Sequence, residues 1–167
     1  ESSSAGMPLR GIYYMNWCAL YTRPRHEMQV LQELTNQRIE AYLPTHKIRR
    51  RWSDRYKIVE EPLFKNYLFV RSDAEHYRKA LSPYGAVSFV TVEGAPAIIP
   101  DEELEALKIM VTSEIPHNPY PYLKIGRKIR VKYGPLEGCE GVLVRKRGLA
   151  RLVVTVHLLQ RSIETEV

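Results

Sequence analysis

The chain has 167 residues, of which 25 are Lys or Arg and 19 are Asp or Glu, so its formal net charge is +6. The hydrophobic fraction of 44% and the charged fraction of 26% exclude a wholly disordered or collagen-like chain. No apolar run reaches the ~18 residues of a membrane-spanning helix, and residues 11–21 lack the features of a signal peptide. Residues 1–14 are interpreted as an added tag or disordered leader. Cys18 and Cys139 are expected to be small buried hydrophobes in a reducing cytoplasm.

The basic excess lies in the last third of the chain. Residues 1–112 contain 15 Lys and Arg against 14 Asp and Glu, whereas residues 113–167 contain 10 against 5. A stretch with three prolines at 115–122 coincides with this change and shows no helical or alternating pattern. We therefore predict a first domain at 15–112, a Pro-rich linker at 113–121 and a second domain at 122–167.

The first domain alternates between strand and helix patterns. Residues 16–22 mix aromatic and apolar side chains and predict a strand, and the spacing of Met28, Leu31 and Leu34 predicts a helix over 25–40. The further expected elements are a segment at 41–52 that turns basic, a returning strand at 56–59, a strand at 63–71, a helix from Asp73 to about 82, a strand at 85–92 and a helix at 100–110. This order predicts an α/β sandwich with a mostly antiparallel sheet and packed helices, in a chain of the α+β class.

The strand expected at 63–70 is apolar on both faces. Strand geometry assigns alternate residues to opposite faces. One face carries Leu63, Lys65, Tyr67 and Phe69, and the other carries Phe64, Asn66, Leu68 and Val70. Either both faces are covered, as in a central strand, or one face is an aromatic patch for a partner. The periodicity does not decide between them.

Two groups of cations stand out in the first domain. The larger group lies within 47–57, has Trp52 and Tyr56 interleaved, and consists of Lys47, Arg49, Arg50, Arg51, Arg55 and Lys57. It is either a solvated hairpin tip or a contact for nucleic acid or an acidic protein surface. The smaller group, Arg23, Arg25 and His26, lies before a helix, where the helix dipole disfavours cations, and this favours a functional role.

The second domain has the pattern of a small β-barrel. Strands are predicted at 125–133, 140–144, 152–158 and 163–167, and glycines mark the turns after the first and the second of them. Its cations outnumber its acids and include Lys124, Arg127, Lys128, Arg130, Lys132, Arg145, Lys146, Arg147 and Arg151. They either solvate the outer strand faces or contact RNA.

No residue pattern indicates catalysis. The five histidines have no metal-ligand spacing, and neither cysteine has a second cysteine or a histidine close by in the sequence. No Gly-rich phosphate loop is present. We predict no enzymatic activity, no cofactor and no metal site.

Several segments together resemble one known family. Residues 16–21, 42–44, 62–70, 85–90 and 94–100 follow the order and spacing of the N-terminal domain of NusG transcription elongation factors. Residues 125–148, with their glycines, resemble the KOW motif. Within the family, residues 61–70 are similar to specialised paralogues of RfaH type. Residues 51–55 are similar to the UpxY group, which controls polysaccharide operons.

This resemblance implies a set of partner contacts. The N-terminal domain is expected to dock on the clamp helices of RNA polymerase through an aromatic-lined hollow, with Tyr67 and Phe69 in the hollow and Trp17 and Phe89 beside it. Leu68 and Val70 then face the core. Arg23, Arg25 and His26 match the positions that read the non-template DNA strand in specialised members. With these three, Arg49, Arg50 and Arg51 complete the candidate nucleic-acid contacts.

The resemblance also implies a mechanism. A factor that bridges the polymerase cleft keeps it closed and suppresses pausing and termination, while the KOW domain recruits a ribosomal protein or Rho. Residues 76–79 stand where RfaH-type proteins touch the opposite side of the cleft with a His-Thr-Thr stretch. The intact glycines and alternation predict a stable barrel rather than the helical hairpin of RfaH. We expect a monomeric, cytoplasmic protein, and the alternative is an RNA-binding or ribosome-associated KOW protein.

Overall fold

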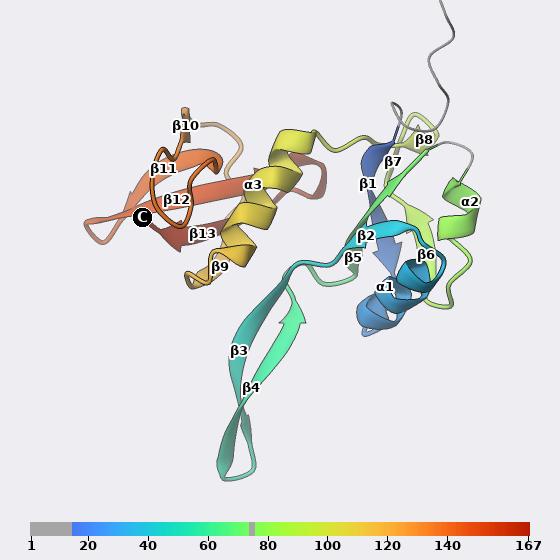
Figure 1. Ribbon diagram of the computed structural model, residues 1–167. Helices are drawn as coiled ribbons and strands as arrows, with labels where there is room; N and C mark the ends of the chain where they lie inside the picture. The colour runs from blue at the N-terminus through green and yellow to red at the C-terminus, as the bar shows by residue number, and fades with distance from the viewer. Residues whose placement is uncertain (1–14, 74–75) are drawn as a thin grey trace, which may run out of the picture.

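The structure is a computed structural model that describes residues 15–73 and 76–167. The leader predicted at 1–14 lies outside the described residues. The described chain forms two sheets, two further hairpins and three α-helices (Figure 1). In chain order the elements are β1 (Asn16–Thr22), α1 (Glu27–Asn36), β2 (Glu40–Tyr42), β3 (Thr45–Trp52), β4 (Arg55–Pro62), β5 (Tyr67–Ser72), α2 (Tyr77–Ala80), β6 (Ala86–Phe89), β7 (Thr91–Val92), β8 (Ala95–Pro96), α3 (Asp101–Thr112), β9 (His117–Tyr120), β10 (Lys128–Arg130), β11 (Glu140–Lys146), β12 (Leu149–Val156), the 3₁₀ turn η1 (His157–Leu159) and β13 (Arg161–Glu166).

The first sheet has the strand order β2-β5-β1-β6. The central pair, β1 and β5, is antiparallel and runs from the Asn16–Ser72 pair to the Tyr21–Tyr67 pair. Every strand pairing among the described residues is antiparallel. The prediction of a mixed fold of helices and mostly antiparallel strands is therefore confirmed.

Helix α1 covers one face of this sheet. It buries Val30 and Leu34, one helical turn apart, in a cluster with Leu68 and Val70 of β5. Met28, which the sequence pattern placed on the buried stripe, is 56% exposed instead. Leu34 is buried and Leu31 is half-buried against the same cluster, as the spacing predicted. Val30 was missed, and it forms with Leu34 the i, i+4 pair that faces the sheet.

Strand β5 begins later than predicted. The chain turns at Asn66, whose φ is 70°, and the strand starts at Tyr67. The backbone N–H of Asn66 donates to a carboxylate oxygen of buried Glu27 at 3.0 Å, which ties this turn to the start of α1. Because the turn interrupts the alternation, Phe64 packs on the same side as Phe69, with 6.1 Å between ring centroids.

The second sheet has the order β10-β11-β12-β13-β9. Consecutive strands β10 to β13 form an antiparallel meander, and the described pairings leave β10 and β9 as the two edges. The pairings therefore describe an open sheet, with β9 as its fifth strand.

Strand β9 lies inside the segment that was predicted as a linker. Residues 117–120 pair with β13, with Pro119 opposite Ile163 and Tyr120 opposite Ser162. A proline cannot donate a ladder hydrogen bond, but an edge strand tolerates it because one of its sides needs no partner. Residues 117–120 of the segment predicted as a linker are therefore a strand of the second sheet.

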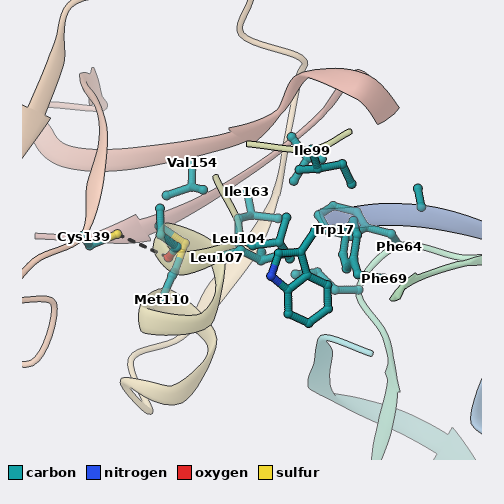
Figure 2. Packing of buried hydrophobic residues seen from close by; sticks show 14 of the residues in the cluster. Trp17, Phe64, Phe69, Ile99, Leu104, Leu107, Met110, Cys139, Val154 and Ile163 are labelled. Carbon is teal, nitrogen blue, oxygen red and sulfur yellow. Dashed lines mark hydrogen bonds between the residues drawn. The ribbon is translucent and has the colours of Figure 1, made fainter. Parts of the chain in front are cut away.

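Helix α3 joins the two sheets through one apolar cluster (Figure 2). Leu104, Leu107 and Met110 are fully buried in a cluster that includes Trp17 of β1 and Val154 of β12. The buried Cys139 thiol donates to the carbonyl of Ala106 in the same helix at 3.4 Å, and burial raises the pKa of this thiol to about 11. Both cysteines are buried, as predicted.

The helices of the described residues are short. The longest is α3 with 12 residues, and none is both long and apolar enough to span a membrane in the part of the chain that the structure describes.

The position of α3 leads to a stability prediction. Leu107→Ala is expected to lower the free energy of unfolding by about 2–5 kcal/mol, because it leaves a cavity in the cluster that both sheets share. Glu105→Ala, on the exposed face of the same helix, is expected to change it by less than about 0.5 kcal/mol. Urea denaturation followed by circular dichroism measures both values. Equal effects of the two substitutions would contradict the packing of α3.

Candidate functional site

The first candidate surface is the aromatic face of β1, β2 and β5, formed by Trp17, Tyr42, Tyr67 and Phe69. The rings of Tyr42 and Phe69 stack with 6.4 Å between centroids. Tyr67 is half-buried, and its ring meets that of Tyr21 edge-on at 5.4 Å. Tyr42 was missed as a member of this face; it lies on neighbouring β2, opposite Phe69 in the register.

The aromatic face is covered in this structure. Phe69 is completely buried and Trp17 is 4% exposed, and both belong to the cluster that contains α3. Lys108 of α3 places its ammonium 4.5 Å from the centre of the Trp17 ring. Both faces of β5 are therefore covered, one by α1 and the other by the cluster that contains α3.

Phe89 lies apart from the other predicted aromatic residues. It is buried in the cluster on the α1 side of the sheet, with Leu68 and Val70, and its ring contacts Tyr77 of α2. In register it stands opposite Leu20, whose side chain faces α1. The structure thus places Trp17, Tyr67 and Phe69 together and Phe89 on the opposite face.

The second candidate surface is a corner formed by Arg23, Arg25, His26 and Tyr84. The guanidinium of Arg23 lies 5.5 Å from the centre of the Tyr84 ring, and His26 meets the same ring edge-on at 5.6 Å. Tyr84 is 65% exposed. Sequence reasoning missed Tyr84, because it is distant along the chain and only the fold brings it to the start of α1.

Backbone contacts hold this corner in shape. The backbone N–H of Arg23 donates to the carbonyl of Gly85 at 2.8 Å, and Gly85 has a φ of 101° beside the His26 side chain. Arg25 has a φ of 65°, in the left-handed region. The Nδ1 atom of His26 lies 2.9 Å from the carbonyl of Pro24. Arg23 and Arg25 remain exposed, so an anion can reach them.

The third candidate surface is the arm, the hairpin of β3 and β4, which projects from the body of the molecule (Figure 1). Arg49, Arg50 and Arg51 are exposed on it. Arg50 forms an ion pair with Glu61 near the base of the arm. The arm and the corner are separate features of the fold, so the predicted nucleic-acid residues divide into two groups.

The cations of the second sheet are mostly exposed. Two of them are engaged by acids, Arg130 with Glu140 and Lys146 with Glu164. His76, in the segment compared with the His-Thr-Thr stretch, contacts the Asp73 carboxylate through its side chain and its backbone N–H. In the described ranges, no group of three or more His, Cys, Asp or Glu residues has the arrangement of a metal site.

A family model described as "Transcription termination factor nusG" matches residues 15–108. This range covers more than half of the chain and includes the aromatic face, the corner and the arm. The chain belongs to the NusG family. NusG-family proteins are transcription factors that bind RNA polymerase.

A solved structure described as "Domain interaction in Thermotoga maritima NusG" has a similar fold. It matches with a TM-score of 0.52 and 19% sequence identity, over 94% of this chain and 95% of that chain. The family model ends at residue 108, but the fold similarity covers most of the chain and so extends into the second sheet. The NusG fold therefore accounts for both parts of the molecule.

The geometry of the corner leads to a prediction about Gly85. A Cβ atom there would lie 2.7 Å from Cβ of His26, whereas a Cβ atom at Gly94 meets nothing within 4 Å. Both glycines have positive φ, so Gly85→Ala and Gly94→Ala share a backbone cost of about 1–2 kcal/mol.

Gly85→Ala is expected to lower the free energy of unfolding by roughly 1–3 kcal/mol more than Gly94→Ala, because it also forces His26 away. Urea denaturation and the imidazole resonances of His26 report the two effects. An unshifted His26 resonance in the Gly85 variant would contradict the close approach.

Proposed function

We propose that this NusG-family protein is a transcription elongation and antitermination factor that docks on the clamp helices of RNA polymerase through its N-terminal part. The observation that carries the proposal is the family match over 15–108, which contains the aromatic face. The proposed contact residues are Trp17, Tyr67 and Phe69. Phe89, on the opposite face of the sheet, supports them from beneath.

The covered state of the aromatic face bears on how docking occurs. Phe69 and Trp17 can meet a partner only after α3 leaves them, because the same cluster now buries both. An amphipathic partner helix offers the same apolar chemistry as Leu104 and Leu107 of α3. We infer that polymerase binding exchanges one helix for the other. The domain interaction named for the Thermotoga protein supports a contact of this kind.

The nucleic-acid contacts are proposed at the two basic surfaces. Arg23, Arg25 and His26 contact the non-template DNA strand, and exposed Tyr84 lies among them. Arg49, Arg50 and Arg51 form the second contact, on the arm. A factor that holds polymerase on one side and nucleic acid on the other keeps the cleft closed and suppresses pausing.

The second sheet is proposed to be a KOW domain of the SH3-like barrel class that recruits a further factor. A ribosomal protein or Rho is the proposed partner, and the domain begins at about residue 122. Its glycine turns and its exposed Ile125 and Tyr133 support a protein-binding role. The similarity of 51–55 and 61–70 to RfaH and UpxY proteins supports an operon-specific role, for example in polysaccharide biosynthesis. We propose a monomeric, non-enzymatic factor without a cofactor.

The polymerase contact is tested with Tyr67→Ala. Tyr67 is half-buried, so its loss is expected to leave the protein folded while weakening RNA polymerase binding about tenfold or more. Co-purification with RNA polymerase and in vitro transcription through a terminator measure binding and activity. Phe69→Ala is a poor test, because a fully buried phenylalanine costs about 3–5 kcal/mol of stability when truncated.

Val92→Ala is the control for Tyr67→Ala, since Val92 is 58% exposed on a separate hairpin. It is expected to bind polymerase as the unchanged protein does. If the unchanged protein does not co-purify with polymerase but binds RNA or ribosomes, the alternative of a ribosome-associated KOW protein is correct.

The DNA contact is tested with the double substitution of Arg23→Ala and Arg25→Ala. It is expected to weaken binding to a paused elongation complex more than binding to free polymerase, because only the complex exposes an unpaired DNA strand. Arg38→Ala is the control, since Arg38 is also exposed and its φ of 60° resembles the 65° of Arg25. Equal losses on complex and free polymerase would contradict the DNA contact.

A further inference from the structure

The tip of the arm is a surface that packs against nothing in the described chain. Strands β3 and β4 pair without interruption from Thr45–Pro62 to Trp52–Arg55, and every residue from 49 to 58 is exposed. A two-stranded hairpin without a packed face is marginally stable in water. The tip therefore contributes little to the core, and its large apolar side chains need another explanation.

Each face of the tip carries one aromatic ring with a cation placed over it. On one face, the guanidinium carbon of Arg49 lies 3.9 Å from the centre of the Tyr56 ring. On the other face, the ammonium of Lys57 lies 5.5 Å from the centre of the Trp52 ring. Both are diagonal pairs between β3 and β4, since Arg49 stands opposite Ile58 and Trp52 opposite Arg55.

The rings remain open to a ligand despite these contacts. Trp52 is 71% exposed and Tyr56 is 59% exposed. A cation can cover one side of a ring and leave the other side available for stacking. The cation on the covered side of the ring can then contact a negatively charged group that neighbours the stacked group in the same ligand.

The charge of the tip specifies an anionic ligand. Between residues 49 and 57 there are five cations, Arg49, Arg50, Arg51, Arg55 and Lys57, and one acid, Asp54. Glu60 and Glu61 lie nearer the base, where Glu61 pairs with Arg50. A ligand that offers both flat aromatic groups and regularly spaced negative charges matches this surface.

We propose that the tip of the arm binds an unpaired nucleic-acid strand, with bases stacked on Trp52 and Tyr56 and with phosphates held by Arg49 and Lys57. Single-strand binding proteins combine aromatic stacking with cations that follow the backbone in this way. The inference rests on the proposed nucleic-acid contact of Arg49, Arg50 and Arg51. It adds that the rings of Trp52 and Tyr56 take part and that the nucleic acid is an unpaired strand.

The distribution over both faces favours a single strand over a duplex. A two-stranded ribbon that enters the major groove directs one face toward the base edges. Here the ring and cation occur on both faces, and a flexible unpaired strand can follow the tip from one face to the other. An acidic protein surface would use the cations, but its carboxylates are not attached to flat aromatic groups that stack on both rings. Because stacking and phosphate contact do not involve the sugar, DNA and RNA strands are expected to bind alike.

The test uses the full chain and a fluorescent thymidine oligomer of about 15 nucleotides, with binding measured by anisotropy. The double substitution of Trp52→Leu and Tyr56→Leu keeps apolar side chains but removes the rings, and it is expected to weaken binding about tenfold or more. The matched double substitution to Phe keeps the rings and is expected to bind within about threefold of the unchanged protein. Circular dichroism confirms that both variants are folded.

Three ligands complete the experiment. A uridine oligomer of the same length is expected to bind like the thymidine oligomer, and a DNA duplex and polyglutamate are expected to bind more weakly. Duplex or polyglutamate binding as tight as the single strand, a preference for only one sugar, or unchanged binding by the Leu variant would overturn the proposal. Polymerase is absent from this assay, so its outcome is independent of the co-purification that tests the proposed function.

Discussion

Helix α3 inserts Leu104, Leu107 and Met110 into a single apolar cluster that draws side chains from both sheets. The rest of the structure depends on this burial. A C-terminal sheet of this size has little core of its own, since small domains bury a smaller fraction of their surface. The first sheet is covered by α1 on only one face. Helix α3 packs against apolar side chains of both sheets, and this shared cluster holds the two sheets together.

That burial also controls when the aromatic face is available. Trp17 cannot contact α3 and a partner at the same time, and Phe69 is buried in the same cluster. Burying one large aromatic or aliphatic side chain contributes about 1.5–3 kcal/mol, so uncovering several costs a substantial part of a typical folding free energy. A partner that replaces α3 restores the contacts that opening removes. The apparent affinity of the protein for such a partner is nevertheless lowered, because only the fraction of molecules in which the aromatic face is uncovered can bind. The aromatic face is thus both a stabilising surface and a binding surface.

The corner and the arm do not depend on this exchange, because both are exposed while the cluster is closed. The positive charge of the corner and the arm does not appear in the net charge of the first 112 residues. The first 112 residues are almost neutral, since acidic residues elsewhere balance the cations of the two basic surfaces. The fold separates these charges in space: Arg23 lies beside Tyr84, and the arginines of the arm extend away from the body. The local density of charge determines how an anion binds. The net charge of +6 was therefore a weak indicator of nucleic-acid binding, and the distribution of the charge was a better one.

The amino-acid sequence alone determined the features that depend on near neighbours in the chain. The extent of β1, the polar turn between β3 and β4, and the presence of strands β11 and β12 follow from local patterns of side chains. The tertiary structure decided what depends on distant segments. Phe64 joins Phe69 because a turn at Asn66 ends the alternation, Pro119 becomes part of an edge strand because β13 has a free side, and Tyr84 reaches Arg23. Phe69 is buried in the cluster to which α3 contributes. A strand that is apolar on both faces has the same pattern whether its second face meets a partner or its own chain, and only the packing of α3 distinguishes the two.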